Sequence, residues 1–334
     1  MKKYLLLPAI LLLTKNSFGI GITPPGDFKF NYTSEYNPKT QYTKVNGDIY
    51  KKIQSNINTG WRSPEVLKSW SSGYKGQNVT VHNFDYHLKD YKKTDFNNAN
   101  NVRKNDGKVY NLVNTHGDKT LAITQAIAPM VKQIGYDVNM YKPGFGYTLN
   151  SGLNIFNVSL MSSSQSMPLR YLSLNDKAVV VISAGNDNHN MGDVIKNGQH
   201  KEMEGKYNLL ANNLKLGNSV IYAGALDRNG TVTNKANKAS YSNKAGEDYF
   251  FQRKFLMVGV DGYKAGFAGT SMAAPIISGY AAIVGSKFNT ATPNQVTNQL
   301  LNTARTDTIL NYNPKIHGRG EVSLTRALAP FKLR

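Results

Sequence analysis

The chain has 334 residues, no cysteine and a formal net charge of +19 at pH 7. The lack of cysteine excludes disulfides, thiolate catalysis and cysteine-ligated zinc. Its composition, 40% apolar and 18% charged, is typical of a globular protein and argues against a disordered chain. The basic balance is compatible with contact with an anionic surface such as a cell-wall polymer, but a solvated basic surface without such a partner is the simpler interpretation. The lysines are scattered, without the dense block of a nucleic-acid-binding arm, so no specific nucleic acid is expected as a partner.

The N-terminus has the pattern of a secretory signal. Lys2 and Lys3 precede an apolar run, Tyr4–Leu13, that is shorter than the roughly 20 residues needed for a membrane-spanning helix. Ser17 and Gly19 place small residues at the two positions that a signal peptidase requires. We therefore predict a cleaved signal peptide rather than an uncleaved anchor, and a secreted protein that is extracellular, periplasmic or bound at the cell surface.

The chain is expected to divide into three regions. Residues 1–19 form the predicted signal peptide. Residues 20–62 are polar and turn-rich, which predicts an N-terminal arm or a short pro-segment. Residues 63–334 alternate short apolar runs with helix-like stretches, which predicts one large domain. The sequence gives no oligomeric state.

The third region predicts an α/β fold. Strands are expected, in chain order, at 79–84, 134–138, 155–158, 178–183 and 219–223. Helices are expected at 115–127, 271–288 and 293–304. Strands that alternate with helices indicate a mostly parallel central sheet with helices on both faces. Reactive groups in such sheets gather at the carboxyl ends of the strands.

The strongest local pattern is the string GTSMAAP at 269–275, followed by a long run of small and apolar residues. It places Ser271 at the start of a helix, where free backbone N–H groups favour developing negative charge. Gly269 permits a tight turn into the helix, and Pro275 is expected near the first turn, where its missing N–H costs little. Small residues such as Gly279 are expected to let this helix pack closely against the sheet.

This string closely resembles the serine motif of the subtilase family. The resemblance implies a subtilisin-like three-layer fold over 63–334 and serine endopeptidase activity on protein or peptide substrates. Subtilases present Asp, His and Ser in that chain order. Asp85 ends the first predicted strand and His116-Gly117 opens the first predicted helix, so the resemblance assigns Asp85 as orienting acid, His116 as base and Ser271 as nucleophile.

The resemblance also implies the remaining site residues. Asn186, which follows a buried strand, would donate its side-chain amide to the oxyanion. Six residues would line the substrate groove: Ser159, Leu160, Met161, Ser183, Ala184 and Gly185. No cofactor is required by the implied mechanism, and calcium would act only as a structural ion. No metal motif supports His82, Asp85 and His87 as a ligand set.

Three departures from the family pattern surround these motifs. Tyr86 and His87 follow Asp85, where the family usually has Ser or Thr and then Gly. Asp118 and Lys119 replace the usual Thr-His pair after His116-Gly117, and Met161 replaces a glycine. These differences leave open a catalytically impaired member of the fold that serves as a binding module. A basic surface-binding protein and an esterase with the same triad are weaker alternatives, since the Gly-x-Ser-x-Gly elbow of many esterases is absent around Ser271.

Overall fold

A computed structural model describes residues 63–85, 116–137, 149–160, 173–191, 217–260 and 268–333. The predicted signal peptide at 1–19 and the predicted arm or pro-segment at 20–62 lie outside these residues. No helix in the described ranges is long and apolar enough to cross a membrane.

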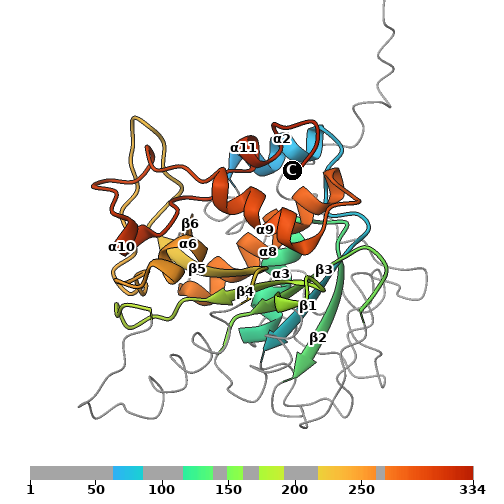
Figure 1. The fold of residues 1–334 in the computed structure, drawn as a ribbon, viewed down its shortest axis with the longest axis horizontal. Helices are drawn as coiled ribbons and strands as arrows, with labels where there is room; N and C mark the ends of the chain where they lie inside the picture. Colours follow the sequence, from blue (N-terminus) through green and yellow to red (C-terminus); the bar gives the residue numbers. More distant parts are fainter. Residues whose placement is uncertain are drawn as a thin grey trace, which may run out of the picture.

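The described strands form one sheet in which every neighbouring pair is parallel (Figure 1). Their spatial order is β2-β1-β3-β4-β5-β6. The strands are β1 Val79–Asp85, β2 Lys132–Asp137, β3 Leu153–Val158, β4 Val179–Ser183, β5 Val220–Leu226 and β6 Phe255–Gly259. Because all run in one direction, Asp85 and the residues that follow β3 and β4 meet at the same edge of the sheet.

Helices cover both faces of this sheet. They are α2 Pro64–Ser71, α3 His116–Ile127, α6 Tyr249–Lys254, α8 Thr270–Lys287, α9 Pro293–Asn302, α10 Pro314–His317 and α11 Leu324–Ala327. Helices α3 and α8 pack against each other and on one face, over side chains such as Val81 and Ile155. Helix α6 lies on the other face, where Phe251 packs edge-on against Tyr222 of β5 and belongs to a second buried apolar cluster. At one end of the molecule α2, α9 and α11 lie together, and α10 lies beside α6 at the other (Figure 1).

The predicted α/β fold with a parallel sheet and helices on both faces is confirmed. Each predicted strand and helix exists, with ends that coincide or differ by at most three residues where they can be compared. Five elements are not among the strands and helices expected from the sequence pattern: α2, α6, α10, α11 and β6. Strand β6 is an apolar run of only five residues directly after a helix. Neither its length nor a flanking turn distinguishes such a run from a continuation of the helix.

Helix α8 departs from the sequence expectations at two residues. Pro275 lies inside the helix, at its sixth position, beyond the first turn. It cannot donate the hydrogen bond that would otherwise reach the carbonyl of Ser271, so the turn that carries Ser271 is tied less tightly to the helix. Gly279 packs against α3 rather than the sheet: a Cβ there would lie 2.5 Å from Ile127 Cγ2. The glycine therefore sets how closely α3 and α8 approach.

A buried histidine lies on the face of β1 opposite to α3 and α8. His82 is fully buried, stacks on Phe156 with ring centroids 4.4 Å apart, and its Nε2 lies 2.9 Å from Asn154 Oδ1. That oxygen is an acceptor, so Nε2 carries the proton of a neutral imidazole. The pKa of His82 is lowered to about 4, mainly by burial and also by the charge of Lys132, against an opposing contribution from the Asn154 hydrogen bond.

This histidine should make the protein sensitive to acid. The unfolded chain binds a proton at His82 below pH 6.5 and the folded chain only near pH 4, so stability is complete above pH 6.5 and falls between these values. Between pH 7 and pH 4.5 we expect His82 to account for a loss of about 2 kcal/mol in the free energy of unfolding. Urea unfolding at pH 4.5 and 7, on a Ser271→Ala background, would measure it.

His82→Phe keeps the stacking on Phe156 and should flatten that pH dependence. His317 leaves a residual slope, because burial also lowers its pKa to about 4. Equal pH dependence with and without His82 would contradict the expectation.

Candidate active site

Asp85 and His116 meet where β1 ends and α3 begins. The Nδ1 atom of His116 lies 2.7 Å from Asp85 Oδ1 and 2.9 Å from Oδ2. The Asp85 side chain is fully buried, whereas the His116 side chain is 33% exposed. A carboxylate can only accept hydrogen bonds, so Nδ1 is the protonated nitrogen of the neutral ring and Nε2 keeps its lone pair.

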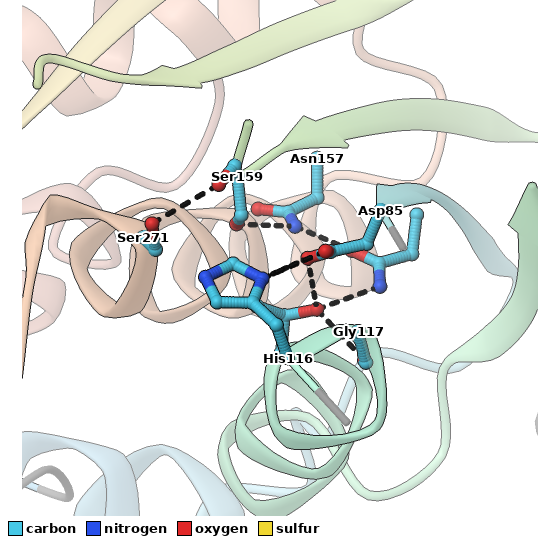
Figure 2. Close-up of polar contacts among 8 residues, drawn as sticks. Asp85, His116, Gly117, Asn157, Ser159 and Ser271 are labelled. Atoms are coloured by element: carbon cyan, nitrogen blue, oxygen red, sulfur yellow. Dashed lines mark hydrogen bonds and ion pairs between the residues drawn. The ribbon is translucent and has the colours of Figure 1, made fainter. Parts of the chain in front are cut away.

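Figure 2 shows the His116 ring between Asp85 and Ser271, with Nε2 on the side of Ser271. Ser271 is the second residue of α8, so its backbone N–H has no acceptor within the helix. Its hydroxyl donates to the carbonyl of Ser159, at 3.0 Å. The hydroxyl is thus held by the residue that follows β3, and a rotation about χ1 would turn it toward His116.

Asn186 is held at the other side of the α8 N-terminus. Its Oδ1 accepts hydrogen bonds from the backbone N–H of Thr270, at 2.8 Å, and from the Thr270 hydroxyl, at 3.0 Å. The Thr270 hydroxyl in turn accepts from Gly185 N–H at 3.0 Å. Because both bonds to Asn186 end on its oxygen, they fix the side-chain amide with Nδ2 as the remaining donor group. At Gly269, with φ of 137°, a Cβ would lie 3.4 Å from that nitrogen.

The predicted groove residues follow β3 and β4. Ser159, Leu160, Ser183 and Ala184 are all buried. The Ser183 hydroxyl has no hydrogen-bond partner within the described ranges. Met161 lies outside the described residues, as do Tyr86 and His87.

Asn243 was not identified from the sequence, yet it holds the loop that carries Asn186. Its Nδ2 donates to the carbonyl of Ala184 at 2.9 Å, and its Oδ1 accepts from the N–H groups of Asp187 and His189 at 3.1 and 2.9 Å. The Asn243 amide therefore supplies hydrogen bonds to the backbone just beyond β4, where no described strand supplies them. None of the motifs identified in the sequence contains Asn243.

Among the residues that the structure describes, no three His, Cys, Asp or Glu side chains come together as a cation site. His87 of the His82, Asp85 and His87 set lies outside those residues, and His82 contacts Asn154 on the opposite face of β1 from α3.

Comparison with known proteins gives the family. The model of the subtilase family matches residues 83–320, which is more than half of the chain. The chain belongs to the subtilase family. It is 28% identical over 268 residues to subtilisin DY of Bacillus licheniformis, an alignment that covers 71% of this chain and 87% of that protein. As a subtilase, the chain is a serine-type endopeptidase, whose substrates are proteins or peptides.

This subtilase also resembles solved structures at lower sequence identity. A lanthipeptide protease is 19% identical with a TM-score of 0.47, covering 83% of this chain and 95% of that one. A cold-adapted subtilisin-like serine proteinase is 20% identical with a TM-score of 0.44, covering 75% and 88%.

The Thr270 hydroxyl links Asn186 to the backbone N–H of Gly185. Thr270→Val keeps the shape of the side chain but leaves the buried N–H of Gly185 without an acceptor. We expect the free energy of unfolding to fall by about 1–3 kcal/mol. Denaturant unfolding on a Ser271→Ala background would measure it. Thr270→Ser, which keeps the hydroxyl, should lose much less, and equal losses in the two variants would contradict this interpretation.

Proposed function

We propose that this subtilase is a secreted endopeptidase that hydrolyses peptide bonds through Asp85, His116 and Ser271 and an acyl-enzyme intermediate. The observation that supports this most is the pair of short contacts from His116 Nδ1 to the Asp85 carboxylate, with the ring lying between Asp85 and Ser271 (Figure 2). This geometry leaves Nε2 as a base on the side of the hydroxyl.

The first half of the reaction begins when the Ser271 hydroxyl leaves the carbonyl of Ser159 and turns to His116 Nε2. Ser271 Oγ then attacks the peptide carbonyl as its proton passes to Nε2. Asp85 keeps the ring in position and stabilises the imidazolium without accepting the proton. His116 gives that proton to the leaving amine. In the second half His116 takes a proton from water, which hydrolyses the acyl-enzyme.

Two donors would stabilise the oxyanion of each tetrahedral intermediate: the Asn186 side-chain amide and the backbone N–H of Ser271. Both belong to groups held before substrate arrives, Asn186 by its bonds to Thr270 and Ser271 by the helix. Preorganised donors of this kind supply much of the stabilisation in acyl transfer.

Ser159, Leu160, Met161 and residues 183–185 would line the groove for the substrate. Secretion rests on the signal pattern at residues 1–19, and the excess of basic residues favours retention near an anionic surface. The mechanism calls for no cofactor, and calcium would serve only to stabilise the fold.

An activated serine can be tested directly with a fluorophosphonate probe on the purified chain without residues 1–19. We expect labelling that is absent in Ser271→Ala and kept in Ser286→Ala, since Ser286 lies on the same helix and bonds only to the carbonyl of Ile283 in the described contacts. Absence of labelling in the folded protein, with and without calcium, would favour the binding module of the same fold.

The oxyanion role of Asn186 predicts a loss in turnover. Asn186→Ala removes one preorganised donor and should lower kcat by about 10²–10³, the loss known for such a donor in a subtilisin, with little change in KM. Steady-state kinetics on a peptide substrate would measure both constants. A variant that changed KM and kept kcat would place Asn186 in substrate binding.

A further inference from the structure

Four polar side chains are fully buried beneath α3 and α8, next to Asp85. They are Asn83 of β1, Asn157 of β3, Thr120 of α3 and Ser278 of α8. Asn83 and Asn157 are direct neighbours in the parallel pairing of β1 with β3, and both lie on the face covered by these helices. Buried amides and hydroxyls cost free energy unless they are hydrogen-bonded, and apolar side chains surround these four.

These side chains form one continuous chain of hydrogen bonds. The Ser278 hydroxyl donates to Asn157 Oδ1 at 3.2 Å, and Asn157 Nδ2 donates to Asn83 Oδ1. Asn83 Nδ2 donates to Thr120 Oγ1 at 2.8 Å. Thr120 Oγ1 lies 3.1 Å from Asp85 Oδ2 and donates to it. The chain thus runs from the helix of Ser271 to the carboxylate beside His116.

The carboxylate fixes the direction of every bond in the chain. An ionised Asp85 can only accept, so Thr120 must donate its single hydroxyl proton and accept from Asn83. Asn83 then turns its oxygen to Asn157, and Asn157 turns its oxygen to Ser278. Charge-assisted bonds are stronger than neutral ones, and aligned bonds polarise one another in a buried site. The alignment therefore favours one orientation of the Asp85 carboxylate.

Thr120 has a competing acceptor in its own helix. Its Oγ1 also lies 2.8 Å from the carbonyl of Gly117, the back-bonding that helical threonines ordinarily adopt. The single hydroxyl proton of Thr120 is shared between these two acceptors. The contact with Oδ2 limits rotation of the carboxylate, which keeps Oδ1 the nearer oxygen to His116 Nδ1, at 2.7 against 2.9 Å.

We propose that Thr120 and Asn83 are positioning residues of the active site, which hold the Asp85 carboxylate in the orientation that receives His116 Nδ1–H. The inference rests on the proposed function of Asp85, His116 and Ser271. Asn157 and Ser278 extend the same support to α8, seven residues after Ser271. Neither Thr120 nor Asn83 touches the reacting atoms, and both act through Asp85.

The test replaces Thr120 by Val, which keeps its shape and removes the hydroxyl. We expect kcat to fall roughly ten- to hundredfold, the rate equivalent of one hydrogen bond to a charged group, with KM changed by less than about twofold. Thr120→Ser, which keeps the hydroxyl, should retain most of the wild-type kcat. Thr124→Val is the matched control: Thr124 lies one turn further along α3, is equally buried, and donates to the carbonyls of Thr120 and Pro275. It should keep kcat.

A second measurement needs no catalysis. On a Ser271→Ala background, the low-field proton resonance of His116 Nδ1–H reports on the bond to Asp85. It should move in Thr120→Val and stay in place in Thr120→Ser and Thr124→Val. A wild-type chain that hydrolyses no peptide would overturn the proposed function while this resonance still tested the positioning. Loss of stability in Thr120→Val with kcat and the resonance unchanged, or equal losses in the Val and Ser variants, would overturn the inference.

Discussion

A carboxylate buried at the end of a parallel strand is the constraint on which the site depends. Asp85 is fully buried, and an ionised group in such a position needs donors on its oxygens. The donors come from α3: the Nδ1 of His116 at its first residue and the hydroxyl of Thr120 one turn later. Helix α3 is therefore held against β1 by the same bonds that orient the imidazole.

Helix α8 carries the nucleophile Ser271 and, by packing on α3, sets its position relative to Asp85 and His116. Gly279 lets it approach α3 until the backbone lies against Ile127, a distance that any larger residue would increase. The helix is apolar on nearly all sides and buried along most of its length, so its position is set by packing rather than by a polar face. Pro275 leaves the carbonyl of Ser271 without its usual partner, and the bond from Ser271 to Ser159 ties that turn to β3 instead.

A separate set of bonds holds the oxyanion side. Thr270 and Asn243 are buried or nearly so, and between them they fix Gly185, Asn186 and the loop that follows. No described hydrogen bond joins this set to the chain that ends on Asp85. Within the described residues the two sets reach α8 at different positions, Thr270 and Ser278, so a substitution in one should leave the geometry of the other largely intact.

The sequence by itself determined the alternation of strands and helices, the parallel sheet and the order of Asp85, His116 and Ser271, because apolar periodicity and short motifs are local properties. Only the tertiary structure decided which polar residues hold the side chains of the active site in position. Asn83 and Asn157 are ordinary strand residues until the register of β1 on β3 makes them neighbours. Thr120 and Ser278 bond to this pair because α3 and α8 cover it. Asn243 supports the site because its loop folds back onto the residues that follow β4. Such roles depend on contacts between residues far apart in the chain, and no local sequence pattern specifies which of these residues meet.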